Sequence, residues 1–270
     1  MSIAVAATGT FGAGILDGLA SRRDIELLLT RPDSAQGRGR KKLPSPAKEV
    51  AKKHDLAVQQ PDRLSEFPGD ARIVIVADYG VLIPEKLLAD RLWLNVHPSL
   101  LPRWRGAAPV ERAIMEGDRE TGVTIHRTTA ELDAGPIAAQ RRFPIGPHDD
   151  AAVVFERATR VALELLDEVF AEPTFVPQPE VGVTYAEKIT AADRDLDWSK
   201  PLEENLNRIR ALSPHIGARG LVEGRRLIVW SARPARPEAA LVAGGIEPLE
   251  VQREGGRRMT TEEYLRGMRK

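Results

Sequence analysis

Short apolar segments of strand length alternate with helix-like segments through the first two-thirds of this 270-residue chain. Near-continuous apolar strands are typical of sheets that are covered on both faces, so the alternation predicts an α/β domain with a mostly parallel sheet. The predicted strands cover residues 3–7, 25–29, 73–77, 92–96, 122–127 and 137–143, and the predicted helices cover residues 15–21, 47–53, 85–88 and 150–170.

The pattern of predicted strands and helices changes after residue 170. Prolines at positions 173, 177 and 179 indicate an extended linker. A predicted helix at 202–212 is followed by short predicted strands at 217–223, 226–232 and 248–252, separated by glycine-containing turns. We therefore predict a small β-rich second domain, with domain limits of 1–176, 177–193 for the linker and 194–270.

Composition excludes several classes of protein. The formal net charge is zero, so any nucleic-acid site must be a local basic patch and not a global field. Cysteine is absent, which excludes disulfides, cysteine–zinc sites and a thiol nucleophile. No apolar stretch is long enough to cross a membrane, no signal peptide is recognisable and no metal-ligand spacing occurs. We expect a cytoplasmic, monomeric protein without a metal.

An amide and an imidazole lie at the end of a predicted strand, and a carboxylate lies in a later loop. Asn95 and His97 are two residues apart, so both side chains leave the strand on the same face, and Asp133 follows in a short loop. Such groups can stabilise a developing oxyanion, hold a charged histidine and steer a proton. His126 alternates with an apolar neighbour and faces either the cleft or solvent, so it is left unassigned.

Two further segments allow a structural and a functional interpretation. Gly9, Gly12 and Gly14 lack the spacing of a dinucleotide-binding loop, which favours a tight strand-to-helix turn over a dehydrogenase site. Residues 31–42 contain five basic side chains and two glycines. This basic segment is either a solvated loop or an arm that neutralises phosphates.

These segments together resemble the folate-dependent formyltransferases. The resemblance lies in residues 95–109 (NVHPSLLPRWRGAAP) and 132–135 (LDAG). Residues 31–46 (RPDSAQGRGRKKLPSP), 184–189 (TYAEKI) and 196–199 (LDWS) are similar to the branch that acts on methionyl-tRNA. The resemblance implies a Rossmann-like catalytic domain, an OB-like C-terminal domain, and transfer of a formyl group from 10-formyltetrahydrofolate to the α-amino group of initiator methionyl-tRNA.

The resemblance also implies roles for individual residues. Asn95 and a protonated His97 would donate hydrogen bonds to the formyl oxygen, while Asp133 favours the imidazolium and helps to relay the amine proton. Residues expected along the folate are Ser99, Leu100, Leu101 and Pro102, with residues 76–83 in the pterin pocket. Residues expected to bind tRNA are Arg38, Arg40, Lys41 and Lys42, together with Arg225, Arg226, Arg257 and Arg258 on the C-terminal domain.

The chain departs from the family pattern at two places. The turn after the first strand is one residue short, and the C-terminal domain is abbreviated, which predicts an incomplete barrel and weakens the tRNA-binding inference more than the catalytic one. Two alternatives stay open. One is a formyltransferase that acts on a nucleotide-linked amino sugar, which shares the Asn–His–Asp set. The other is a folate- or RNA-binding relic without activity.

Overall fold

The computed structural model describes residues 2–36 and 41–268. The chain forms two compact units, each made of several segments. Unit 1 comprises Met1–Ala107, Gly122–Phe143 and Phe155–Tyr185, and unit 2 comprises Ala108–Thr121, Pro144–Val154 and Ala186–Lys270. The units therefore interleave along the sequence, whereas the predicted domain limits divide it into consecutive pieces.

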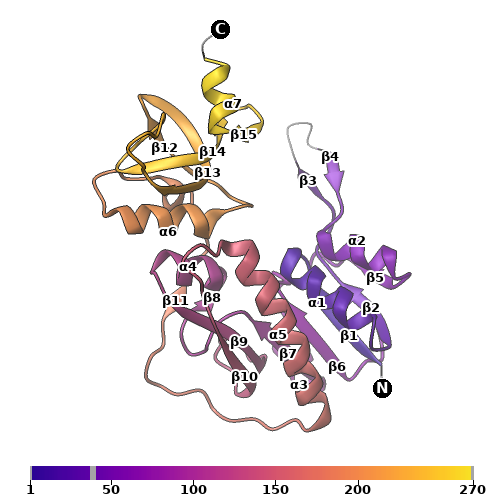
Figure 1. The fold of residues 1–270 in the computed structure, drawn as a ribbon. Coiled ribbons are helices and arrows are strands. Elements are labelled where there is room, and N and C mark those ends of the chain that lie inside the picture. The colour runs from indigo at the N-terminus through magenta and orange to yellow at the C-terminus, as the bar shows by residue number, and fades with distance from the viewer. Residues whose placement is uncertain (1, 37–40, 269–270) are drawn as a thin grey trace. The chain divides into compact units, whose positions relative to one another are not determined.

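A seven-stranded sheet forms the centre of unit 1 (Figure 1). The strand order is β10-β9-β7-β6-β1-β2-β5, and β1, β2, β5, β6 and β7 pair in parallel while β9 runs antiparallel to β7. This arrangement confirms the predicted α/β class with a mostly parallel sheet. The strands are β1 (Ile3–Ala7), β2 (Ile25–Leu29), β5 (Ala57–Gln59), β6 (Ile73–Ala77), β7 (Leu92–His97), β9 (Glu120–Arg127) and β10 (Ile137–Pro144).

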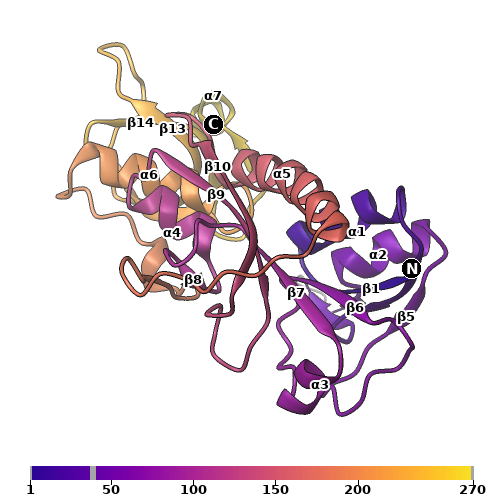
Figure 2. The ribbon, with the colours of Figure 1, turned by 90° about the horizontal axis from the view of Figure 1, so that it is seen from below.

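Helices cover both faces of this sheet, as the apolar strands require. Figure 2 shows α1 (Thr10–Ala20), α2 (Pro46–Lys53) and α5 (Ala151–Ala171) on one face and α3 (Glu85–Asp90) on the other. Phe11 of α1 packs against Phe155 of α5, with ring centroids 5.7 Å apart. No helix within residues 2–36 and 41–268 has the length and apolar character needed to cross a bilayer.

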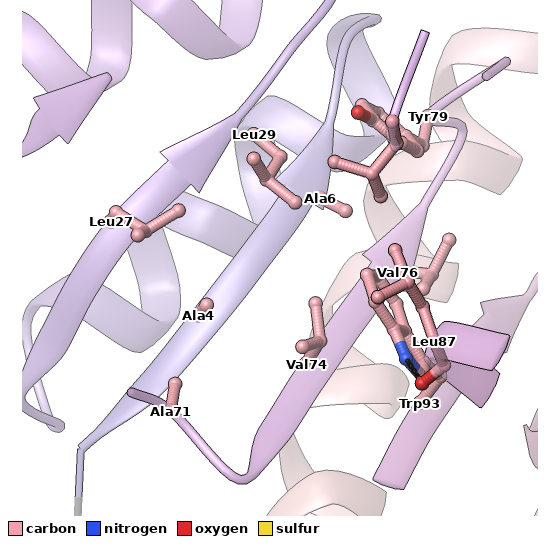
Figure 3. Packing of buried hydrophobic residues seen from close by; sticks show 11 residues of the cluster. Ala4, Ala6, Leu27, Leu29, Ala71, Val74, Val76, Tyr79, Leu87 and Trp93 are labelled. Carbon is pink, nitrogen blue, oxygen red and sulfur yellow. Dashed lines mark hydrogen bonds between the residues drawn. The ribbon is translucent and has the colours of Figure 1, made fainter. Parts of the chain in front are cut away.

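On the α3 face, the core is a cluster of apolar side chains from four neighbouring strands (Figure 3). Trp93 is its largest member, and its indole N–H donates to the carbonyl of Leu87 at 2.8 Å. Phe67 packs edge-on against Trp93. Because the indole nitrogen has a partner, Trp93 can be buried beneath α3 without an unsatisfied polar atom.

The shortened turn after β1 is completed by the carboxyl group of Asp78, the residue that directly follows β6. Asp78 accepts hydrogen bonds from the backbone N–H groups of Thr8, Gly9 and Gly12, at 3.2, 2.9 and 3.2 Å. A Cβ at Gly12 would lie 2.5 Å from a carboxylate oxygen of Asp78. The helix N-terminus, where a dinucleotide would place a phosphate, thus already holds the carboxyl group of Asp78, which agrees with the turn interpretation of these glycines.

Unit 2 contains an antiparallel four-stranded meander in the order β12-β13-β14-β15. Over the described residues β12 and β15 form its two edges, so the sheet is open, in agreement with the incomplete barrel predicted. Its apolar core includes Val229, Ile246 and Tyr264. The elements are α4 (Pro109–Met115), the 3-10 turn η1 (Ala192–Arg194), α6 (Leu202–Leu212), β12 (Ala218–Val222), β13 (Arg225–Pro234), β14 (Ile246–Arg253), β15 (Arg258–Thr260) and α7 (Thr261–Arg266).

The elements missing from the sequence prediction are mostly very short. They are β3 (Ser34–Gln36), β4 (Lys41–Leu43), β5, β8 (Arg105–Gly106), β11 (Tyr185–Ala186), β15, η1, α4 and α7. Strands of two or three residues contain too few positions for a periodic signal. In the basic segment, β3 and β4 pair antiparallel. Arg38 and Arg40 lie outside the described residues.

The proline-rich segment after α5 is not a free linker. Val176 exchanges two backbone hydrogen bonds with Ile137 at the start of β10, at 2.8 and 2.9 Å. These bonds attach the segment to the edge of the large sheet, because β10 is the outermost strand on that side. The sequence predicted its extended conformation but not this attachment, which depends on a partner far away along the chain.

Candidate active site

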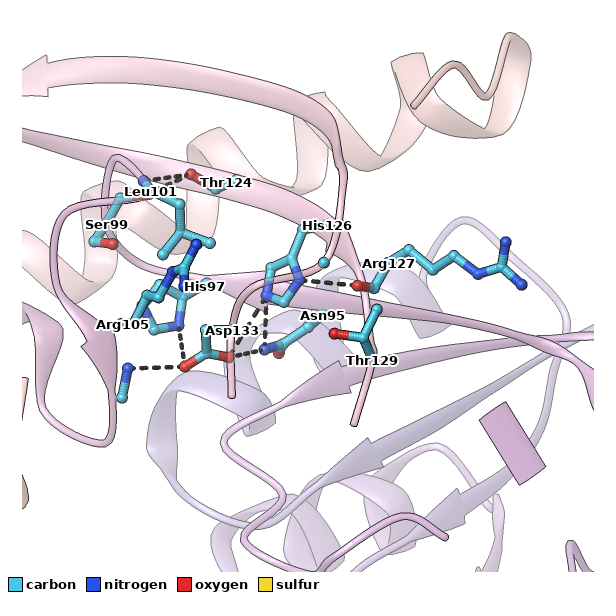
Figure 4. A network of polar contacts seen from close by, with 12 residues as sticks. Asn95, His97, Ser99, Leu101, Arg105, Thr124, His126, Arg127, Thr129 and Asp133 are labelled. Carbon is cyan, nitrogen blue, oxygen red and sulfur yellow. Dashed lines mark hydrogen bonds and ion pairs between the residues drawn. The ribbon is translucent and has the colours of Figure 1, made fainter. Parts of the chain in front are cut away.

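The predicted amide, imidazole and carboxylate meet at the C-terminal end of β7 (Figure 4). Asn95 and His97 leave this strand on one face, and Asp133 reaches them from the loop between β9 and β10. The Asn95 amide donates to Asp133 Oδ1 at 2.9 Å, and His97 Nδ1 lies 3.7 Å from Asp133 Oδ2. The structure therefore brings together the three residues that the sequence singled out for catalysis.

The ring of His97 is held by a backbone carbonyl. His97 Nε2 lies 2.8 Å from the carbonyl oxygen of Trp104, which can only accept, so Nε2 carries the hydrogen and Nδ1 faces Asp133. Burial lowers the pKa of His97, against the opposing effects of the Asp133 charge and the Trp104 carbonyl. A neutral ring with a free lone pair on Nδ1 is thus favoured, whereas the sequence led us to expect a charged imidazolium.

Asp133 remains a carboxylate despite its buried position. Burial acts to raise the pKa of Asp133, but the hydrogen bond that a protonated His126 donates, the charges that both histidines carry when protonated, and the Gly106 N–H together lower it to about 2. The Gly106 N–H donates to Asp133 Oδ2 at 2.8 Å. The backbone of Asp133 has a φ of +48°, in the left-handed region that non-glycine residues seldom adopt. The loop therefore holds this anion in a demanding conformation.

His126 belongs to the same cluster, although the sequence left it unassigned. It is 1% exposed and lies opposite Asn95 in the β7–β9 pairing. His126 Nδ1 is 3.1 Å from the carbonyl of Arg127, and Nε2 is 3.1 Å from the Asn95 amide nitrogen and 3.6 Å from Asp133. These partners fit a neutral ring that donates from Nδ1 and accepts at Nε2. The alternation of His126 with Ile125 along the strand allowed a position facing the cleft, but the sequence did not show that His126 pairs with Asn95 across the sheet.

One consequence concerns the hydrogen-bond donors of Asn95. A side-chain amide has two N–H groups, and those of Asn95 point to Asp133 and to His126 Nε2. Asn95 therefore links the carboxylate to the second histidine. For the amide to donate to a substrate oxygen, one of these two hydrogen bonds must be exchanged.

The four residues expected along the folate form the loop directly after His97. Thr124 and Gln140 fix this loop: the Leu101 N–H donates to Thr124 Oγ1 at 3.1 Å, Thr124 donates to the Ser99 carbonyl at 2.7 Å, and Gln140 donates to the Leu101 carbonyl at 2.9 Å. Ser99 and Leu101 are buried, and Leu100 and Pro102 are half-buried. They adjoin the catalytic cluster, and contact with a folate remains a prediction.

The basic segment is not part of this cluster. Its stem is held by Lys48, whose ammonium lies 2.8 Å from Asp33, and by Gln60, which donates to the Arg31 carbonyl at 2.8 Å. Lys41 and Lys42 lie on β4, where Lys42 is exposed.

The C-terminal arginines differ from one another in their surroundings. On unit 2, Arg258 forms an ion pair with Glu250, and Arg257 lies 3.8 Å from Glu263, so part of their charge is neutralised. Arg225 and Arg226 begin β13 and are exposed. Across the described parts of both units, no group of three or more His, Asp or Glu side chains could hold a metal ion.

Comparison with known proteins identifies the family. The formyl transferase family matches residues 1–170, and the C-terminal domain of formyl transferases matches residues 188–269. A methionyl-tRNA formyltransferase of Paracoccus denitrificans is 38% identical, with 99% of this chain and 98% of that relative aligned. One from Dechloromonas aromatica is 36% identical, with 99% and 96% aligned. The chain belongs to the methionyl-tRNA formyltransferase family.

Membership of this family confirms the resemblance and makes the chain an enzyme of the formyltransferase class. Solved structures agree on the fold. A methionyl-tRNA formyltransferase from Clostridium thermocellum has a TM-score of 0.63 at 15% identity, covering 92% of this chain and 98% of its own. HypX from Aquifex aeolicus, solved in complex with tetrahydrofolic acid, has a TM-score of 0.69 at 18% identity, covering 98% of this chain and 46% of its own.

Proposed function

We propose that this formyltransferase moves the formyl group of 10-formyltetrahydrofolate to the α-amino group of initiator methionyl-tRNA, giving N-formylmethionyl-tRNA for translation initiation. The observation that carries the proposal is the buried cluster of Asn95, His97 and Asp133 in a chain that aligns with methionyl-tRNA formyltransferases over nearly its whole length. The folate supplies the formyl group, bonded to its N10 atom.

The resting cluster is suited to accept a proton from the attacking amine. A neutral His97 presents the lone pair of Nδ1, and this nitrogen takes the proton as the amine forms its new bond. The Asp133 carboxylate, 3.7 Å away, then stabilises the resulting imidazolium. The proton stored on His97 is available to the departing nitrogen, so no metal is required for this step.

Asn95 supplies the hydrogen bond to the formyl oxygen. Of its two N–H groups, the one directed at the Asp133 carboxylate makes the stronger, charge-assisted bond. The one directed at the neutral His126 ring is therefore the one exchanged for the oxygen on which negative charge develops. An oxyanion donor of this kind contributes ~2.7–4 kcal/mol to transition-state stabilisation.

We assign tRNA binding to the basic segment and to unit 2. Arg38, Arg40, Lys41 and Lys42 would contact phosphates of the acceptor arm, with Arg225 and Arg226 on β13 as further contacts. A local patch of this kind allows a chain with zero net charge to bind a polyanion. A cytoplasmic location and a monomeric state are part of the same proposal, and size-exclusion chromatography with light scattering tests the latter.

Formylation assays with purified protein and 10-formyltetrahydrofolate test the proposal. Charged initiator methionyl-tRNA should be formylated, and uncharged tRNA should not. A nucleotide-linked amino sugar is the comparison acceptor, because the sequence left that alternative open. Formylation of the amino sugar with no product from methionyl-tRNA would replace the proposed acceptor. Folate binding without transfer to either acceptor would indicate an inactive relic.

A further inference from the structure

The proline-rich segment after α5 reaches the catalytic loop through one side chain. The Gln178 amide nitrogen donates to the backbone carbonyls of Asp133 and Gly135, at 2.7 and 2.9 Å. Two residues earlier, Val176 is fixed to Ile137 by a pair of backbone hydrogen bonds. Gln178 is therefore presented from an anchored stretch of chain and not from a free linker.

The oxygen of the same amide is held from the other side. Gln178 Oε1 accepts from Arg105 Nη2 at 2.8 Å and from Nε at 3.2 Å. The two donors and two acceptor sites of the amide are thus all used, which leaves one possible orientation for it. Arg105 is 8% exposed, so these hydrogen bonds are largely shielded from water.

Arg105 stands between two groups that touch the catalytic residues. The carbonyl of the preceding residue, Trp104, accepts from His97, and the N–H of the following residue, Gly106, donates to Asp133. Gln178 therefore connects the loop that orients His97 with the loop that carries Asp133. Both loops approach the site from distant parts of the sequence, and this amide joins them directly.

The Asp133 loop needs such support because its backbone is constrained. Asp133 has a φ of +48°, and a Cβ at Gly135 would lie 1.8 Å from the Arg127 carbonyl oxygen. Aspartate adopts the left-handed region more readily than most non-glycine residues, but this region is still uncommon for it, and surrounding contacts select it. The hydrogen bond from Gln178 to the Asp133 carbonyl acts at the residue under this constraint.

We propose that Gln178 is a positioning residue that fixes the Asp133 carboxylate against His97, so that the proline-rich segment is a structural part of the active site. The proposal rests on the proposed function only for the catalytic role of Asp133. Without Gln178, the Asp133 backbone can relax, and its carboxylate moves away from His97, Asn95 and the Gly106 amide.

Two substitutions at one position test this inference. Gln178→Leu removes all four hydrogen bonds while keeping much of the side-chain volume. Gln178→Glu keeps the acceptors for Arg105 but loses both donors to the Asp133 loop. We expect kcat to fall about 10- to 100-fold in both variants, with the KM values for folate and tRNA little changed, because misplacement of a catalytic group acts on the chemical step.

A second measurement separates positioning from a general loss of stability. The pKa of Asp133, followed by carbon NMR of its carboxyl group, should rise from about 2 toward its ordinary value of 3.8 in both variants. Leu166→Ala is the matched destabilised control, because Leu166 is fully buried in α5. It should lower the melting temperature while leaving the Asp133 pKa unchanged.

The possible outcomes are distinct. Wild-type kcat and an unchanged Asp133 pKa in Gln178→Leu would overturn the proposal, whatever its melting temperature. An active Gln178→Glu would also overturn it, since the essential contact would then be the one to Arg105. Asp133→Asn with full activity would instead refute the catalytic role in the proposed function, while a shifted Asp133 pKa in the Gln178 variants would still establish positioning.

Discussion

The catalytic cluster and the basic segment of unit 1 have opposite physical characters. Asn95 makes hydrogen bonds to Asp133 and His126, both histidines lie within 3.7 Å of the Asp133 carboxylate, and three of these four side chains are at most 10% exposed. In the basic segment, β3 and β4 form a short two-stranded stem on which Lys42 is exposed. We infer from this difference that proton transfer requires fixed geometry in a shielded site, whereas phosphate binding depends mainly on the number of charges within reach of the phosphates.

Removal of a group from the buried cluster should have the largest effect. We expect His97→Ala and Asn95→Ala each to lower kcat about 100- to 1,000-fold, because each removes a group positioned for the transition state. Single-turnover formylation with saturating methionyl-tRNA measures this, and tetrahydrofolate affinity serves as the control for an intact site. Unchanged turnover in either variant would remove that residue from the mechanism.

Acid should weaken the cluster in a defined pH window. The pKa of Asp133 is lowered from 3.8 to about 2 in the folded chain. Its ionised form therefore stabilises the fold fully above pH 3.8, and this contribution is lost as the pH falls toward 2. The difference corresponds to about 2 kcal/mol of unfolding free energy.

Urea unfolding of the wild type and of Asp133→Asn at pH 6 and near pH 2.5 measures this contribution. The stability advantage of the wild type should shrink at the lower pH. An advantage that is equal at both pH values would mean that Asp133 is not held as an anion by its neighbours.

Loss of charge from the basic segment should act on tRNA binding alone. We expect replacement of Arg38, Arg40, Lys41 and Lys42 by alanine to raise the KM for tRNA about 10-fold or more and to flatten its dependence on salt, because fewer counterions are released. The KM for folate and kcat should stay near wild type. Measurement of KM at several salt concentrations checks this, and an unchanged salt slope would show that the segment does not touch phosphate.

A substitution that weakens the stem of the basic segment should have the smallest effect on tRNA binding. Lys48→Met removes the ion pair to Asp33 but leaves the charges at positions 38–42 in place. A partly exposed pair of this kind contributes up to about 1 kcal/mol, so we expect a rise in the KM for tRNA of up to about 5-fold with an unchanged salt slope. An effect as large as that of the alanine variant would mean that fixed geometry matters as much in the basic segment as in the buried cluster.

Local pattern was enough to predict much of the fold and part of the site. The strands at 3–7, 25–29 and 73–77 agree with β1, β2 and β6, because continuous apolar runs leave little choice but a buried strand. The two-residue spacing of Asn95 and His97 placed both on one face of β7. The abbreviated C-terminal region predicted an incomplete or smaller barrel, and strands β12–β15 form a four-stranded sheet there.

Contacts between distant segments could not be predicted in this way. His126 joined the cluster because β9 pairs antiparallel with β7, and Asp78 completed the α1 turn from the end of β6. The lowered pKa of His97 depends on burial, which a strand pattern does not measure.

The sequence by itself determined the family, the α/β class and the identity of the amide, imidazole and carboxylate, because these follow from local periodicity and from the order of motifs. Only the tertiary structure decided how the three groups face one another, that His126 stands beside them, and that Gln178 supports the Asp133 loop. The physical reason is that proton affinity and hydrogen-bond geometry depend on burial and on partners many residues away, and folding alone brings these together.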